Sequence, residues 1–154
     1  PEMLGRRMVR ILAFILPLAA FALSPSPASQ SAETLAGPVP ARLLRVIDGD
    51  TIAVSARIWL GQAVETLVRV DGVDTPELKG KCAAERKLAR RARGFVIDFL
   101  SAGGVTLRDV QYGKFAGRVV SRVLNGDGHD LTAALIAKGL GRIYAGRKRG
   151  SWCV

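Results

Sequence analysis

Apolar, β-branched runs alternate with turn residues from Ala41 onward, the pattern of a strand-rich domain. The runs that predict strands are 43–47, 51–54, 57–60, 64–70, 105–108 and 118–124. The first two are separated by Asp48-Gly49-Asp50, and the next pair flanks Gly61-Gln62. Both separators are tight-turn sequences, so two hairpins are expected in the first half of the domain.

The pattern changes to a helical period between Ala83 and Ser101 and again near the C-terminus. The longer segment carries an apolar stripe at Leu88, Ala92, Phe95 and Phe99. Gly103-Gly104 ends that helix, and a shorter one is expected over 131–138, capped by Asp130 and ended by Gly139. Although six runs are named, the expected domain has five strands, with a helix after the third and another after the fifth, and is mainly β within the α+β class. A small closed β-barrel is the expected architecture.

The N-terminus has the layout of an export signal. Arginines at 6, 7 and 10 precede an uncharged apolar run over 11–23, and small residues allow cleavage after Ala28. Ala20-Phe21-Ala22 is an alternative cleavage site. We therefore expect a signal peptide over 1–28, a flexible leader over 29–40 and a domain over 41–154, with the protein exported to the periplasm or secreted. The alternative is an uncleaved N-terminal membrane anchor, although the apolar run is shorter than a spanning helix needs.

The net charge of the chain indicates which class of partner the domain binds. The chain holds 23 Lys and Arg against 13 Asp and Glu, a formal net charge of +10. Most of that excess lies outside the predicted signal, so it belongs to the domain. A polyanion is the expected partner class, with nucleic acid first and an anionic membrane second. One His and two Cys are too few for a structural zinc site and leave His129 as the only candidate for a histidine triad.

Two acidic clusters stand at strand ends. The first is Asp48-Gly49-Asp50-Thr51, and the second runs from Arg69 through Asp74-Thr75-Pro76-Glu77. Each also has a plain structural interpretation, as a hairpin turn and as the acidic first turn of a helix. If Asp50 and Asp74 converge, a cation between them relieves their repulsion. Their oxygens, with the Thr75 carbonyl, suit Ca²⁺, and Glu77 would lie within reach of a nearby water, an arrangement for hydrolysis.

A third segment, Tyr112-Gly113-Lys114-Phe115-Ala116-Gly117-Arg118, opens a predicted strand. A basic loop on a basic protein is its plain interpretation. A second arginine opposite Arg69 would instead hold a phosphate by forked N–H donors. Phosphoryl transfer depends mainly on positioning and charge neutralisation, so two arginines and a divalent cation form a coherent set.

These three segments, in this order, resemble the Asp-Gly-Asp-Thr, Arg-x4-Asp-Thr-Pro-Glu and Tyr-Gly-Arg motifs of the staphylococcal nuclease (thermonuclease) family. The resemblance spans about Leu43 to Tyr144. It implies a five-stranded OB-fold barrel with two or three helices and Ca²⁺-dependent hydrolysis of DNA and RNA that leaves 3′-phosphate ends. By position, Asp50, Asp74 and the Thr75 carbonyl would be metal ligands, and Arg69, Glu77 and Arg118 would be catalytic.

The third motif departs from the family pattern, as though residues were inserted before Arg118. Arg122, four residues along the same strand, is therefore the alternative to Arg118. Tyr112, Lys114 and Tyr144 are the candidate substrate-binding residues, and for either tyrosine the alternative is an ordinary half-buried barrel position. The segment Arg147-Lys148-Arg149 is expected to be a solvated basic tail, and nonspecific contact with phosphates is the alternative.

Cys82 and Cys153 are expected to form a disulfide if the protein is exported, and to stay free and buried in a reducing compartment. A bond between them would close a loop of about 70 residues and stabilise the fold by about 4 kcal/mol.

Together these observations predict an exported, Ca²⁺-dependent endonuclease that acts as a monomer on single-stranded or locally open DNA and RNA. No stable membrane contact is expected after signal cleavage. The alternative is an OB-fold module that binds nucleic acid by charge and stacking without cutting it.

Overall fold

The computed structural model of the protein describes residues 33–114 and 117–153. The predicted signal peptide, 1–28, lies outside the described residues, as does the start of the predicted leader. The strands are β1 (Thr34–Leu35), β2 (Val39–Asp48), β3 (Thr51–Trp59), β4 (Gln62–Val70), β5 (Val73–Asp74), β6 (Val105–Tyr112), β7 (Arg118–Leu124) and β8 (Arg142–Ile143). The helices are α1 (Ala83–Ser101) and α2 (Leu131–Ala137).

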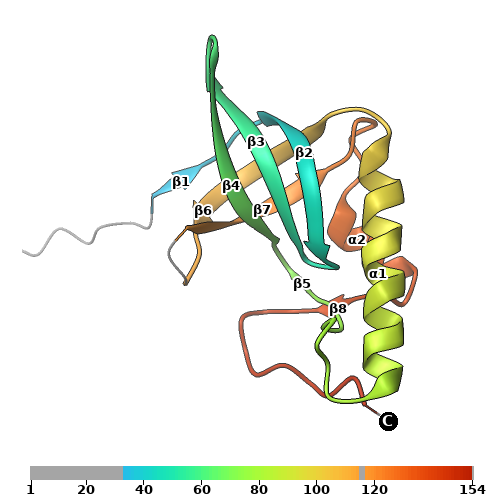
Figure 1. Ribbon diagram of the computed structural model, residues 1–154. Helices are drawn as coiled ribbons and strands as arrows, with labels where there is room; N and C mark the ends of the chain where they lie inside the picture. Colours follow the sequence, from blue (N-terminus) through green and yellow to red (C-terminus); the bar gives the residue numbers. More distant parts are fainter. Residues whose placement is uncertain (1–32, 115–116, 154) are drawn as a thin grey trace, which may run out of the picture.

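Five of these strands close into a barrel in the order β2-β3-β4-β7-β6, with β6 also paired to β2 (Figure 1). The β4–β7 pair is parallel and the other barrel pairs are antiparallel. Closure leaves the barrel without an open sheet edge. The predicted five-stranded, OB-type barrel with a helix after its third strand and another after its fifth is confirmed.

Strand boundaries differ from the sequence prediction in two places. The predicted runs 51–54 and 57–60 form one continuous strand, β3, which pairs with β4 along its whole length. In addition, β2 begins at Val39 and β1 pairs with β6 at Gln111 and Val110, so ordered strands occupy part of the segment expected to be a flexible leader. Pro40 is the second residue of β2, and the beginning of a strand tolerates proline.

The core fills the barrel and the space beneath α1. Helix α1 packs against β2, and α2 packs against β7 and α1. The buried face of α1 comprises Glu85, Ala89, Ala92, Val96 and Leu100. The predicted stripe was therefore displaced: Ala92 is buried, whereas Leu88, Phe95 and Phe99 are partly buried and pack beside the core. Asp130 caps α2 as predicted, its side chain accepting the backbone N–H of Ala133.

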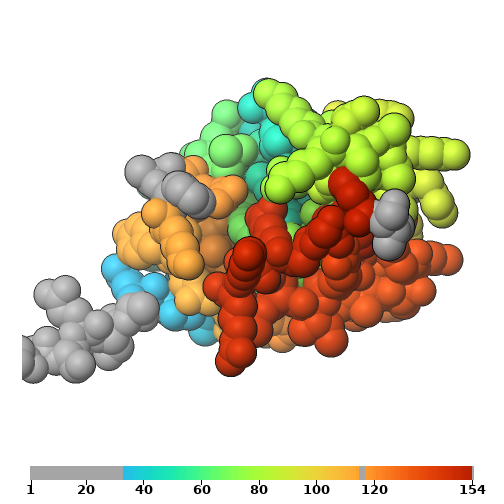
Figure 2. All heavy atoms as spheres, turned by 90° about the horizontal axis from the view of Figure 1, so that it is seen from below, coloured from blue at the N-terminus to red at the C-terminus, as the bar shows by residue number. Residues whose placement is uncertain are grey.

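Below the barrel, a two-stranded sheet of β5 and β8 ties the middle of the chain to its C-terminal segment (Figure 1). From β8 the chain runs to Cys153, which forms a disulfide with Cys82 at the start of α1, the two Cα atoms lying 6.0 Å apart. Viewed from below, the red C-terminal residues lie against the yellow-green chain that leads into α1 (Figure 2). In the described part of the chain, neither helix has the length and hydropathy needed to cross a membrane.

Candidate active site

The Asp48-Gly49-Asp50 turn between β2 and β3 forms one wall of the site. A β-bulge in β2 between Val46 and Asp48 precedes it, and bulges of this kind re-aim the residues that follow. A Cβ added to Gly49 would lie 2.8 Å from Thr75 Oγ1 and 3.0 Å from the Ala92 Cβ. Glycine therefore lets this turn pack directly against the second acidic segment and α1.

Asp50 and Arg69 are brought together by strand register. The β3–β4 hairpin pairs Thr51 with Arg69, so the residue before Thr51 lies beside the arginine. The two side chains form an ion pair in which both are buried, and the guanidinium also donates to the Val73 carbonyl at 3.0 Å. Thr51 Oγ1 donates to the Asp50 carboxylate at 3.0 Å. Both groups are thus fixed before any ligand binds.

Asp48 contributes a second carboxylate to the same wall. Its Oδ1 accepts the backbone N–H of Asp50 at 3.2 Å. The pKa of Asp48 is raised to about 6, mainly by burial and next by the negative charge of Asp50. The shift indicates crowding of negative charge at this turn, which a cation would relieve.

The second acidic segment leaves the barrel through β5. Asp74 pairs with Arg142 in the β5–β8 sheet, and both Asp74 and Thr75 are buried. Glu77 lies beyond them with its side chain 59% exposed. Buried Glu85 of α1 fixes the following loop, because its carboxylate accepts the backbone N–H groups of Glu77 at 3.4 Å and Lys81 at 2.9 Å.

Arg118, the first residue of β7, completes this group. The parallel pairing of β7 with β4 sets Arg118 opposite Leu67, two residues from Arg69 along the neighbouring strand. Arg118 and Arg69 line one hollow at this end of the barrel, here called the acidic hollow. Its lining comprises Asp48, Asp50, Thr51, Arg69, Thr75, Pro76, Glu77, Arg118 and Arg149. Arg122, the alternative to Arg118, instead pairs with Asp130 at 3.1 Å.

Arg149 is the residue of the hollow that sequence reasoning missed. Instead of standing in a solvated tail, its Nε lies 3.1 Å from Asp74 Oδ1 and its Nη1 2.6 Å from Glu77 Oε1. Burial lowers the pKa of Arg149, but the carboxylates of Asp50, Asp74 and Glu77 outweigh that effect and raise it above the ordinary value.

The cysteine positions held the signal for this contact. Cys82 follows Glu77 by five residues, and Cys153 follows Arg149 by four. A disulfide between the cysteines therefore brings Arg149 back to the neighbourhood of Glu77. Trp152 adds a second tie, since its indole Nε1–H donates to Asp74 Oδ2 at 3.1 Å.

A family model described as "Staphylococcal nuclease homologue" matches residues 67–151. The chain belongs to the staphylococcal nuclease homologue family. The matched range includes Arg69, Asp74, Glu77 and Arg118 and begins after the Asp48-Gly49-Asp50 turn, which the structure adds to the same hollow. No curated protein matches the chain. Membership makes the domain a nuclease or a nucleic-acid-binding module.

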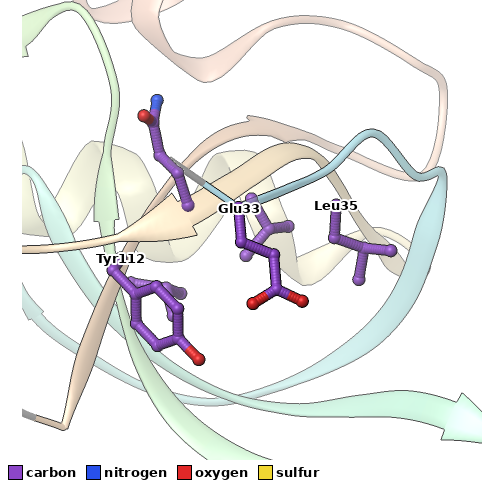
Figure 3. Close-up of a pocket in the computed structure, with 6 residues that line it drawn as sticks. Glu33, Leu35 and Tyr112 are labelled. Atoms are coloured by element: carbon purple, nitrogen blue, oxygen red, sulfur yellow. The ribbon is translucent and has the colours of Figure 1, made fainter. Parts of the chain in front are cut away.

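The substrate-binding candidates of this family member divide between two places. Tyr144 and Lys114 line a second hollow beside the acidic one, here called the tyrosine hollow, and the Arg69 guanidinium lies 5.5 Å from the Tyr144 ring centroid. Tyr112 is 80% exposed and lines a separate pocket with Glu33 and Leu35 (Figure 3). The structure thus brings Tyr144 and Lys114 to the site and leaves Tyr112 apart from it.

The donor set fits a hard cation. Buried Asp74 Oδ1 accepts no well-aligned hydrogen bond from the residues described, although Arg149 Nε is near it. The carboxylates at the Asp48-Gly49-Asp50 turn face the same hollow as Thr75. Carboxylate and carbonyl oxygens in an irregular arrangement suit Ca²⁺. All three residues predicted as ligands are buried: Asp50 and Thr75 line the acidic hollow, whereas Asp74 lines a neighbouring hollow that also includes Thr75, Glu77 and Arg149.

Proposed function

We propose that the protein is an exported, Ca²⁺-dependent nuclease that hydrolyses phosphodiester bonds of DNA and RNA and leaves 3′-phosphate ends. The observation that carries the proposal is the acidic hollow, where carboxylates and arginines from four separate parts of the chain converge. A module that only binds a polyanion has no use for a group of acids at its phosphate site, because they repel phosphate. Family membership supports the same reaction class.

Asp50, Asp74 and the Thr75 carbonyl are the residues that would hold the cation. When bound there, Ca²⁺ supplies positive charge to a nonbridging phosphate oxygen. Asp50 is already oriented by Thr51 and neutralised by Arg69, so it needs little rearrangement to act as a ligand.

Glu77 is the candidate general base. Its side chain is 59% exposed, whereas those of Asp50 and Asp74 are 6% and 5% exposed, so water reaches Glu77 readily. In the proposed reaction Glu77 accepts a proton from the attacking water or orients that water. Arg69 and Arg118 neutralise the negative charge that grows on the phosphate oxygens as the bond breaks. A bond forms between the water oxygen and phosphorus while the bond from phosphorus to the 5′ oxygen breaks on the opposite side, and the departing 5′ oxygen takes up a proton from solvent, which leaves a 3′-phosphate and a 5′-hydroxyl.

The nucleic-acid strand is expected to continue from the acidic hollow into the tyrosine hollow. Tyr144 offers a ring for base stacking there, and Lys114 offers a positive charge for the backbone. Tyr112 stays a weaker candidate, because its pocket is separate. The substrate is proposed to be single-stranded or locally open, since stacking requires an unpaired base.

Export is supported by the disulfide, which oxidising compartments favour, together with the signal-like N-terminus. We propose that the mature protein acts as a monomer in the periplasm or outside the cell, without stable membrane contact.

Degradation of single-stranded DNA and RNA by the purified protein tests the proposal, first with Ca²⁺ and then with excess chelator. Cleavage that requires Ca²⁺ and yields 3′-phosphate ends is the expected result. Salt-sensitive binding without cleavage under both conditions would overturn it and make the protein a nucleic-acid-binding module.

A further inference from the structure

Three arginines are the only residues shared by the linings of the acidic hollow and the tyrosine hollow in the described part of the chain. They are Arg69, Arg118 and Arg149. These side chains therefore stand between the carboxylates on one side and Tyr144 with Lys114 on the other. A phosphate group whose nucleoside stacks in the tyrosine hollow must pass this row of guanidinium groups to reach the carboxylates.

Arg69 and Arg149 differ in side-chain exposure and in the partners that hold each guanidinium. The Arg69 side chain is 10% exposed and is held by Asp50 and the Val73 carbonyl. The Arg149 side chain is 40% exposed, and its guanidinium pairs with the carboxylates of Asp74 and Glu77 and lies 6.0 Å from the Tyr144 ring centroid. Those are the carboxylates that the proposed function assigns to the cation and to the attacking water. The Arg149 guanidinium is therefore exposed enough to leave these carboxylates and pair with a phosphate when a cation binds Asp74.

Contacts on both sides of Arg149 hold the C-terminal segment so that the Arg149 guanidinium lies beside Asp74 and Glu77. The Cys82–Cys153 disulfide anchors the segment beyond Arg149. Before it, β8 pairs with β5, and the Arg142 guanidinium stacks on the Trp152 ring at 3.5 Å from the centroid. Arg142 also donates to the Ser151 carbonyl at 2.7 Å. Ties on both sides of Arg149 limit where its guanidinium can reach.

We propose that Arg149 is a third phosphate-binding arginine of the site, which rests on Asp74 and Glu77 and transfers to the substrate phosphate when a cation takes its place. This inference rests on the proposed function for its account of the cation. Its own claim concerns binding: the guanidinium fork that spans two carboxylate side chains presents the same paired donors to two phosphate oxygens.

The proposal predicts opposite changes for two ligands in Arg149→Ala. Because Arg149 competes with a cation for Asp74, its removal should tighten Ca²⁺ binding, measured by calorimetry without nucleic acid. Because it also binds phosphate, its removal should weaken binding of a short nuclease-resistant phosphorothioate oligonucleotide by about tenfold or more, measured by fluorescence anisotropy. Arg149→Lys keeps the charge but loses the forked pair of donors, so its oligonucleotide affinity should lie between those of Arg149→Ala and the wild type.

Arg147→Ala is the matched control, since it removes the same charge from the same exposed segment. It should weaken oligonucleotide binding only through net charge, with a small loss that shrinks as salt is raised. Thermal unfolding of all three variants verifies that each remains folded.

Equal losses of oligonucleotide affinity in Arg149→Ala and Arg147→Ala would overturn the proposal. So would tighter Ca²⁺ binding with unchanged oligonucleotide affinity, since Arg149 would then only obstruct the cation site. Failure of the nuclease proposal is distinguishable from either result. A wild-type protein that binds the oligonucleotide but cuts no DNA would refute the enzyme while leaving the Arg149 comparison intact.

Discussion

Two arginines face carboxylates at the same end of this barrel, yet they are held by different means. Arg69 belongs to β4, and its partner Asp50 immediately precedes β3, so antiparallel pairing alone makes the two neighbours. Arg149 lies in an irregular segment, and it reaches Asp74 and Glu77 because a disulfide and a few side-chain contacts bend that segment back. The Arg69–Asp50 contact follows from strand pairing, whereas the contacts of Arg149 depend on a disulfide.

The difference separates what is built into the barrel from what is added to it. The Arg69–Asp50 pair is buried, so its loss would leave a charge without a partner in a poorly solvated place. The Arg149 side chain is 40% exposed and its partner Glu77 59% exposed, so water can replace that contact at small cost. The barrel end should therefore govern stability and chemistry, whereas the C-terminal segment should tune binding.

The largest expected effect is on the chemistry that the barrel end supports. Glu77→Gln removes the carboxylate that the proposed reaction uses as its base, and loss of a general base lowers rates by about 10²–10⁴-fold. Initial rates of single-stranded DNA cleavage in saturating Ca²⁺ measure this. The fold should be unaffected, because the Glu77 side chain is 59% exposed.

Glu65→Gln makes the same chemical change at an exposed position of β4 and serves as the control. Its cleavage rate should equal that of the wild type. An undiminished rate in Glu77→Gln would remove Glu77 from the mechanism.

Arg69→Met tests the buried half of the comparison. Removing one partner of a buried ion pair costs about 3–5 kcal/mol, because the remaining Asp50 charge lacks compensation. Urea-induced unfolding measures the loss. Arg122→Met is matched in residue type, but its pair with Asp130 is half exposed, so about 0.2–1 kcal/mol is expected there. Similar losses in the two variants would show that burial does not distinguish these pairs.

The same contrast explains which parts of the site could be predicted. Asp50 and Arg69 follow from a hairpin whose turn and strands are local in sequence, and the parallel approach of β7 brings Arg118 to the position suggested by its motif. The role of Arg149 required knowing that two cysteines 71 residues apart are bonded, which residue spacing alone does not establish. Because Arg149 is one of three consecutive basic residues, the sequence pattern indicated a solvated tail instead.

Other differences have similarly long-range causes. Val39 joins the barrel because it pairs with Leu107, on a strand that lies far along the chain. Nothing in the proline-rich sequence before Ala41 indicates that pairing. In α1, the stripe chosen from large apolar residues lay beside the true buried face. Small residues, Ala89 and Ala92, are what allow the helix to approach its neighbours closely.

The disulfide gives the next effect in size. Replacing both cysteines by serine opens a loop of 71 residues, and treatments based on chain entropy give a loss of about 4 kcal/mol, within a usual range of about 2–5. Thermal unfolding with and without a reducing agent measures it: reductant should lower the melting temperature of the wild type and leave the double variant unchanged. The double variant should retain cleavage, because the barrel holds Asp50 and the Glu85 carboxylate holds the loop that carries Glu77 without the disulfide. Complete loss of cleavage in a folded double variant would mean that the C-terminal segment belongs to the chemistry and not only to binding.

The smallest expected effect comes from a single donor in the C-terminal segment. Trp152→Phe keeps a ring against Arg142 but removes the indole N–H that donates to Asp74 Oδ2. A hydrogen bond to a charged group is worth about 1.5–3 kcal/mol, and partial exposure of Trp152 favours the lower figure. Urea unfolding compared with the Arg69→Met variant measures the difference directly. A loss as large as that of Arg69→Met would contradict the division drawn here, because it would make a contact at the added segment as important to the fold as an ion pair inside the barrel.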